Sequence, residues 1–363
     1  MRQIVITKII ASLFALSLNS WIGEANAQTE SDSSTLFTQV WIAEPGDTGL
    51  NRWNPRQLFE ESGEVLDWNA KQLVFRRPGA KTSTTIPGDH VVRIEPRWAD
   101  ESLEKIHRMF FERQFQRVYI EGGTLINSVK DKGLPLWQVQ VILAEIVESN
   151  SALGKPQLAA RIFAALAKSK GEERIELPQL LLATIPLPWG ETSLMDADLS
   201  TLRPFCEEWL ASDTESLQLL GAAWLISGVK RANAIEKLES LARTAKSPIV
   251  SAYARVQLWR TVPPAEILSE HLPRWITERD KLLLPAQAGP TMLLADRLEK
   301  AGQSNLAIPE WLRIATLHAD RYHLATKAIS KASGALRSGG KNEEADQVQS
   351  LLDRFKIDDK IKK

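Results

Sequence analysis

The side chains best suited to metal binding or proton transfer are the histidines, but their spacing does not predict a site. The five are His90, His107, His271, His318 and His323. Only His318 and His323 lie close together, five residues apart, whereas two ligands on one helical face need a spacing of three or four. Asp320 and His323 have a spacing of three, so a zinc site with a distant third ligand is one interpretation. A solvated helix start, with Asp320 as the N-cap and His323 in the first turn, is the interpretation that we favour.

The chain contains a single cysteine, Cys206, so it forms no intramolecular disulfide. Cys206 lies among Phe205, Trp209 and Leu210 in a helical pattern, with no histidine nearby in the sequence. A nucleophilic thiol needs a neighbouring base. The sequence therefore predicts a buried, inert thiol.

Nucleotide-binding and serine-nucleophile motifs are absent from the sequence. Gly154-Lys155 lacks the first glycine of a phosphate loop and is followed by Pro156, where that motif needs Ser or Thr. Glu121-Gly122-Gly123 lacks the third glycine of a dinucleotide fingerprint. No serine lies in a Gly-x-Ser-x-Gly elbow. We assign no cofactor and no cofactor-binding residue.

Adjacent acidic residues occur as Glu60-Glu61, Glu172-Glu173 and Glu207-Glu208. Neighbouring residues on a helix point in different directions, so these pairs indicate solvated faces. A catalytic pair needs two environments that separate its pKa values. We assign no catalytic residue and no metal ligand, although dispersed carboxylates of a helical-toroid enzyme would leave no motif.

Tryptophan is abundant, with twelve residues, and it is suited both to core packing and to partner contacts. Trp209, Trp224 and Trp259 match the apolar faces of predicted helices. Trp189 ends a rigid, proline-containing run over 185–190, where it either locks neighbouring helices or presents an exposed ring. A second candidate contact is a basic hairpin tip around the Pro78-Gly79 turn, formed by Arg76, Arg77 and Lys81; a solvated tip that prevents edge pairing is the alternative.

The first 27 residues have the pattern of a cleavable signal peptide. Arg2 and Lys8 form a basic start, an apolar run follows over 9–18, and the small residues of 25–27 precede Gln28. The apolar run is shorter than the roughly 20 residues that a membrane-spanning helix needs. We therefore expect an exported protein, periplasmic or secreted after cleavage near Ala27-Gln28.

The charge of the chain is balanced, with 45 basic and 45 acidic residues. Binding to nucleic acid depends on neutralising many phosphates, so this balance argues against it. No later segment is long and apolar enough for a membrane span. The predicted partner is another envelope or secreted protein or a peptide, and a glycan is the alternative.

Short strands separated by turns fill residues 35–97, after a polar, flexible N-terminus at 28–34. We expect Leu66 and Trp68 to lie on one apolar face, and a short helix over 55–61 capped by Asn54. The pattern predicts a small antiparallel meander, SH3-like or Sm-like, with strands at 36–42, 63–68, 71–76, 81–86 and 90–95.

After Pro96 the apolar period changes from two to about 3.6 residues, which predicts helices through residues 98–356. A basic tail follows at 357–363. Helices of similar length alternate with short loops, and alanines recur at contact positions. The pattern indicates about five to seven helical pairs, with clear helices at 135–148, 216–228, 248–259, 321–336 and 342–355.

The final helical pair carries small and apolar residues at repeat-like spacing: Ala328, Ala332, Leu336, Gly339, Gly340, Ala345 and Leu352. A second hairpin, over 143–166, has Gly154 in its turn and Ala159 five residues later. Both segments resemble tetratricopeptide-type hairpins, and the helical part is similar to the tetratricopeptide-like α-solenoids of exported bacterial proteins. This resemblance implies stacked hairpins that bind proteins or peptides on a concave face.

Taken together, the sequence predicts a mainly α protein, an α-solenoid of stacked helical hairpins preceded by a small antiparallel β-domain. The leading functional hypothesis is a non-enzymatic interaction or scaffold protein of the cell envelope. Two alternatives stay open: a helical-toroid enzyme acting on polysaccharide or peptidoglycan, and a wall-glycan binding module carried by the β-domain.

Overall fold

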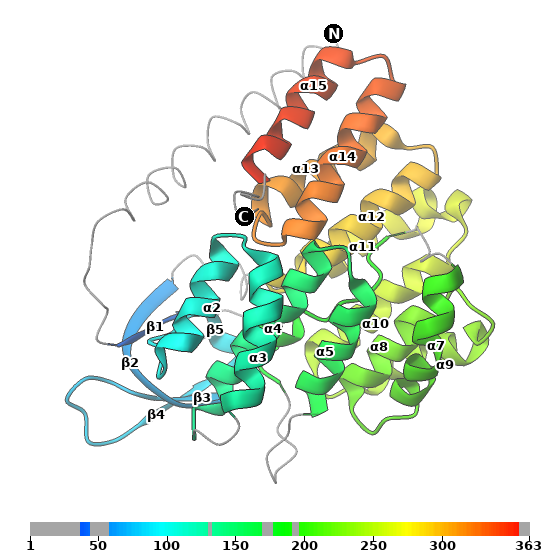
Figure 1. The fold of residues 1–363 in the computed structure, drawn as a ribbon. Coiled ribbons are helices and arrows are strands. Elements are labelled where there is room, and N and C mark those ends of the chain that lie inside the picture. Colours follow the sequence, from blue (N-terminus) through cyan, green and yellow to red (C-terminus); the bar gives the residue numbers. More distant parts are fainter. Residues whose placement is uncertain (1–36, 44–57, 130–132, 169–176, 191–195, 356–363) are drawn as a thin grey trace. The chain divides into compact units, whose positions relative to one another are not determined.

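The computed structural model describes residues 37–43, 58–129, 133–168, 177–190 and 196–355 (Figure 1). The predicted signal peptide, the polar segment at 28–34 and the basic tail at 357–363 lie outside the described residues.

The described chain begins with a five-stranded antiparallel sheet of order β4-β3-β2-β1-β5. A 3₁₀ turn, Gly88–His90, separates the last two strands. The predicted meander is confirmed at this level, and its strands are β1 Thr38–Ala43, β2 Leu58–Trp68, β3 Gln72–Arg76, β4 Thr84–Pro87 and β5 Val91–Glu95.

The prediction that Leu66 and Trp68 lie on the same face of the sheet is wrong, because β2 contains a bulge. The register with β3 shifts between Val65 and Asp67. A bulge adds one residue to one strand and interrupts the alternation of its faces. Val65 and Trp68 are therefore buried, while Leu66, expected beside Trp68, is 43% exposed.

The short helix predicted over 55–61 is also wrong for its described part. Residues from Leu58 onward belong to β2 and pair with β1, with Leu58 opposite Ala43 and Glu61 opposite Val40. Pairing with a neighbouring strand thus outweighs the local helix-start signal. Asn54 and Pro55, the expected cap and first helical residue, lie outside the described residues.

The rest of the described chain is helical, as predicted (Figure 1). Helices that are neighbours in sequence pack together, for example α3 with α4, α7 with α8 and α13 with α14. None of the described helices is long and apolar enough to cross a membrane. Their bounds are α2 Glu101–Phe111, α3 Phe115–Val129, α4 Leu136–Ala152, α5 Pro156–Lys168, α6 Gln179–Leu182, α7 Asp196–Leu210, α8 Glu215–Leu225, α9 Arg231–Thr244, α10 Pro248–Leu258, α11 Leu272–Asp280, α12 Ala288–Lys300, α13 Ser304–Leu317, α14 Tyr322–Ser338 and α15 Asn342–Ser350.

Several local signals operate as the sequence predicts. Pro248 occupies the first turn of α10, where its missing N–H costs nothing. Gly340 follows α14 with φ of 76°, the left-handed conformation that glycine adopts most readily at a helix end. Cys206 is buried, and burial raises the pKa of its thiol to about 12, which keeps the reactive thiolate form scarce.

A segment with little regular structure, residues 183–190, is almost entirely buried among the helices. Buried backbone carbonyls need hydrogen-bond donors, and side chains of distant helices provide them here. Trp224 Nε1 on α8 donates to the carbonyl of Pro186 at 3.2 Å. Arg321, just before α14, donates to the carbonyl of Ala183.

Helices that are far apart in sequence also contact each other. The rings of Phe115 on α3 and Tyr322 on α14 meet edge-on, with centroids 5.0 Å apart. Glu148 on α4 forms an ion pair with Arg321. In a helical array each hairpin contacts only its neighbours, so a simple array does not explain these two contacts. The solenoid arrangement stays a prediction.

The sheet shares its hydrophobic core with α4 and the helices that follow it, and a second, smaller cluster lies between α2, α3 and α4. Trp68 at the end of β2 packs edge-on against Trp137 on α4, with ring centroids 6.3 Å apart. Gln138 on α4 also holds the connection between β5 and α2, since it accepts from the N–H of Ala99 and donates to the carbonyl of Arg97.

Candidate functional site

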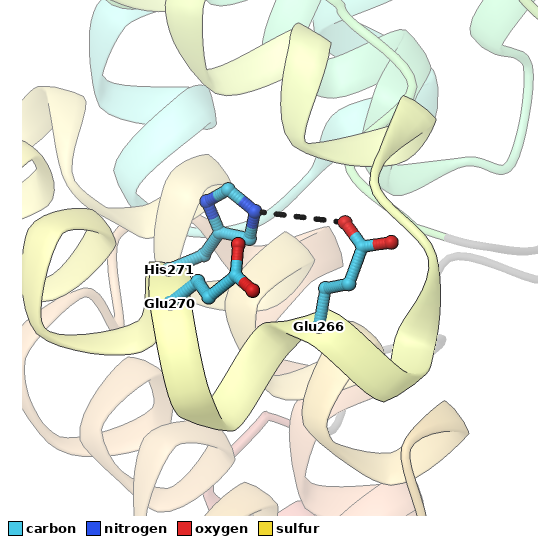
Figure 2. Close-up of side chains that lie close together, drawn as sticks. All are labelled: Glu266, Glu270 and His271. Atoms are coloured by element: carbon cyan, nitrogen blue, oxygen red, sulfur yellow. Dashed lines mark ion pairs between the residues drawn. The ribbon is translucent and has the colours of Figure 1, made fainter.

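One cluster of the described residues has the composition of a metal site. Glu266, Glu270 and His271 place one ligand atom each within 4.8 Å of one another (Figure 2). They lie in a 3₁₀ turn and a π-helical turn over Pro264–Glu266 and Ile267–His271, and π turns often mark functional sites. His271 Nε2 faces Glu266 Oε2 at 4.0 Å.

The surroundings of His271 do not fit a metal centre. Arg274 Nη2 lies 3.0 Å from His271 Nδ1, and a guanidinium only donates, so Nδ1 accepts. In the neutral ring the proton is then on Nε2, the atom that would have to bind the metal. Metal-binding histidines instead donate their second N–H to a carboxylate or carbonyl. The cluster is better described as an imidazole N–H directed at Glu266.

A second group of ionisable side chains lies inside the helical part. Arg321 pairs with Glu148 and also donates to the carbonyls of Ala183 and Pro285. Burial raises the pKa of Glu148, and the charge of Arg321 opposes that rise. His323 Nδ1 lies 3.6 Å from the same carboxylate, and burial, followed by repulsion from Arg321, lowers the pKa of His323.

The cavity beside this group is too small for a substrate. Its volume is about 10 Å³, room for one water at most. The hydrogen bonds of Arg321 end on α4, on the irregular segment at Ala183 and on the 3₁₀ turn Leu284–Ala286. A side chain that joins three segments of its own chain in this way stabilises the fold. Neither interpretation of Asp320 and His323 from the sequence fits the structure. The carboxylate within ion-pair distance of His323 belongs to Glu148, and the N-cap residue of α14 is Arg321, with no side-chain capping bond.

A neighbouring buried network has the same character. Arg279, only 2% exposed, binds Glu310 and Asp280, and Asp280 also contacts Arg313 at 3.3 Å. His318 is buried beside these cations. Burial, together with repulsion by the nearby arginines, lowers the pKa of His318 to about 3. It is therefore neutral in the folded protein and suited to packing.

Two arginines of the predicted hairpin tip are paired within the sheet. Arg76 binds Glu64, and Arg77 binds Glu61 through two hydrogen bonds. The hydrogen bond to Arg77 lowers the pKa of Glu61. Lys81, between β3 and β4, is exposed. The positive charges of Arg76 and Arg77 are therefore paired with glutamates of β2, and Lys81 is the exposed cation of the predicted tip.

The other predicted contact, Trp189, is 8% exposed. Its ring packs edge-on against Tyr253, with centroids 4.9 Å apart, and covers Gly289 on α12. Trp189 was expected either to hold neighbouring helices together or to present an exposed ring. These contacts fit the first role and leave no face of the ring for a partner.

A different aromatic group reaches the surface where the sheet leads into α2. We call Trp98, His107 and Phe111 the aromatic cluster. The centroid of the His107 ring lies 4.9 Å from that of Trp98 and 4.7 Å from that of Phe111. Phe111 is 66% exposed, the largest value among the exposed aromatic residues described.

The aromatic cluster is held from behind by a buried carboxylate. Glu145 on α4 binds Nδ1 of His107, and burial raises the pKa of Glu145, opposed by His107. Nδ1 of His107 is thereby fixed, and no described residue is found bonded to Nε2. The cluster offers a polar ring atom between two aromatic side chains on a rigid base, which suits binding by stacking.

A groove of about 430 Å³ lies between α14 and the 3₁₀ turn Leu351–Phe355. Its walls combine aromatic, aliphatic, hydroxyl and ammonium groups: Tyr322, Thr326, Lys327, Ser330, Leu352 and Phe355. The volume falls within the usual range for ligand pockets.

Neither surface feature was predicted from the sequence, for different reasons. His107 and Phe111 lie four residues apart on α2, and Glu145 interrupts an apolar run of α4, so these signals were present in the sequence. The groove left no such signal, since its walls come from α14 and a turn folded back on it.

Comparison with known proteins gives no assignment: no family model, curated protein or solved structure matches this chain.

Proposed function

We propose that this chain is an exported, non-enzymatic interaction protein of the cell envelope that holds a protein partner through the aromatic cluster. Exposed aromatic rings on a rigid base are the usual centres of protein interfaces. Phe111 is the observation that carries the proposal, because two thirds of its surface faces solvent while neighbouring rings fix its position.

The buried carboxylates favour this proposal over a helical-toroid enzyme. Glu145 binds His107, Glu148 binds Arg321, and Asp296 binds Lys331. A general acid or base needs access to substrate within hydrogen-bond reach. Carboxylates engaged with cations of the same chain are better suited to fixing the fold.

The arrangement of tryptophans gives the wall-glycan alternative less support. A glycan module would present a row of exposed tryptophan rings on the sheet. Of the two described tryptophans in the strands, Trp68 is buried, and the Arg93 guanidinium lies over the partly exposed Trp41, 4.8 Å from the ring centroid; Trp53 lies outside the described residues. Export remains part of the proposal and rests on the signal-peptide pattern of residues 1–27.

Affinity capture with point variants tests the proposal. Mature residues 28–363 are immobilised, and bound proteins and polysaccharides from an envelope extract are identified by mass spectrometry. Phe111→Ala is expected to weaken capture of a stoichiometric protein by about tenfold or more, as at interface hot spots. Because Phe111 is largely exposed, the variant should keep the wild-type circular dichroism spectrum.

Phe205→Ala is the matched control, since Phe205 is also a surface phenylalanine but lies on α7, against Trp209 and Arg161. It should capture the partner as the wild type does. Equal loss in both variants, or retention of polysaccharide in place of protein, counts against the proposal. Export is checked separately, by finding Gln28 at the N-terminus of the protein recovered outside the cytoplasm.

A further inference from the structure

The groove along α14 is built so that most of its polar groups accept hydrogen bonds. Thr326 Oγ1 donates to the carbonyl of Tyr322 at 2.9 Å, and Ser330 Oγ donates to the carbonyl of Thr326 at 3.1 Å. The Tyr322 hydroxyl donates to the carbonyl of Phe355. Each hydroxyl hydrogen is therefore used within the chain, and the hydroxyl oxygens are left with lone pairs for a donor.

Lys327 is the one cation among the residues that line this groove. Among the described residues, no hydrogen bond or ion pair is found for its ammonium. The described acidic group whose charge acts on Lys327, Asp296, is already bound to Lys331 at 3.0 Å and to Trp311 Nε1 at 3.1 Å. Lys327 thus offers donors that the described residues leave unused.

The environment of Lys327 strengthens its attraction for an anion. Burial is the largest influence and lowers the pKa of Lys327; repulsion by Lys331 also lowers it, while Asp296 opposes both. A partly desolvated ammonium interacts with a carboxylate more strongly than one in bulk water does. The side chain is nevertheless exposed enough for a ligand to reach it.

The apolar walls of the groove indicate that the anion carries an apolar group. Leu352 and Phe355 come from the 3₁₀ turn, and the ring of Tyr322 completes the wall. Arg113 lies over the ring of Phe355, 5.4 Å from its centroid, which adds positive charge beside the groove. An anion with an apolar body matches both the charge and the surface.

We propose that this groove binds a small carboxylate of the N-acylated amino-acid type. The carboxylate contacts Lys327, the amide N–H donates to the oxygen of Thr326 or Ser330, and the apolar side chain packs on Leu352 and Phe355. This site is separate from the aromatic cluster and does not depend on the proposed interaction function.

N-acetyl-L-phenylalanine is the probe, and its amide, which lacks the negative charge, is the matched control compound. Binding to the mature protein is measured by calorimetry, and shielding of Lys327 from acylation is followed by peptide mass spectrometry. The acid should bind and shield Lys327, and the amide should bind about tenfold or more weakly, as the loss of a charge-assisted hydrogen bond implies.

Lys327→Gln is expected to weaken binding of the acid by a similar factor, and Lys327→Arg to retain most of it. Lys341→Gln, at an exposed lysine before α15, should bind as the wild type does. Equal binding of acid and amide, an unaffected Lys327→Gln variant, or dissociation constants above about 10 mM would each overturn the proposal. None of these outcomes bears on partner capture through Phe111.

Discussion

The indole of Trp189 lies directly on the α-carbon of Gly289, at a point where α12 has no room for any side chain. A Cβ added to Gly289 would fall well inside contact distance of Cε2 and Cδ2 of that ring. Trp189 ends the buried segment 183–190, and Gly289 opens a helix that is buried over most of its length. This contact fixes the irregular segment against the helical core.

Gly289→Ala is expected to destabilise the protein by about 1–3 kcal/mol, the cost of overpacking a tight core. The methyl group would force the Trp189 ring away from Tyr253, which it meets edge-on. Urea unfolding followed by tryptophan fluorescence measures the change.

Gly334→Ala is the matched control, because no atom lies near its added Cβ and the residue is in the interior of α14. There the substitution should stabilise the helix by up to about 1 kcal/mol. Equal effects of the two alanines would show that the Trp189 contact is not tight.

Arg321→Met is expected to lower the free energy of unfolding by about 3–5 kcal/mol, because the buried carboxylate of Glu148 loses its counter-charge. The carbonyls of Ala183 and Pro285 lose their donor at the same time. The double variant Glu148→Gln with Arg321→Met should cost less than the sum of the two single changes.

The control for that cycle is Arg337→Met, which removes an exposed pair with Asp346. Exposed pairs contribute about 0–1 kcal/mol, so this variant should unfold near the wild-type midpoint. If Arg321→Met were as stable as Arg337→Met, the buried arginine would not be the lock between α4, the 183–190 segment and α14.

Periodicity predicted the helical part and the burial of Trp209, Trp224 and Trp259 because these depend on neighbours three or four residues away. The exposure of Leu66 could not be predicted, since a bulge appears only when β2 meets β3. The contacts that decide the helices are local and leave a period in the sequence. The contact that decides the bulge is between two strands and leaves none.

The candidate sites follow the same division. The aromatic cluster was within reach, because His107 and Phe111 are four residues apart on one helix. The pairing of Glu148 with Arg321 and the burial of Trp189 against Gly289 join segments from different helices. Residue spacing carries no information about such contacts, so the sequence favoured a locking role for Trp189 but left a surface role open.

His318 should make the stability of the protein fall as the pH decreases below about 6.5, the ordinary value for histidine. Its pKa in the folded protein is about 3, so the unfolded chain binds the proton more readily between these values. Each pH unit in this window removes about 1.4 kcal/mol of stability through this one residue. The stabilising contribution is fully present above the unfolded pKa and is lost toward acid pH.

The contribution of His318 is isolated by comparing the wild type with His318→Leu, because Glu145 and Glu148, whose pKa values are raised, shift stability in the opposite direction. Between about pH 7 and pH 5 the wild type should lose about 2 kcal/mol more than the variant does. Urea unfolding at both pH values gives this difference, and NMR of the imidazole should show no protonation of His318 in that range. Parallel pH profiles of the two proteins would mean that His318 reaches solvent and is protonated while the protein is folded.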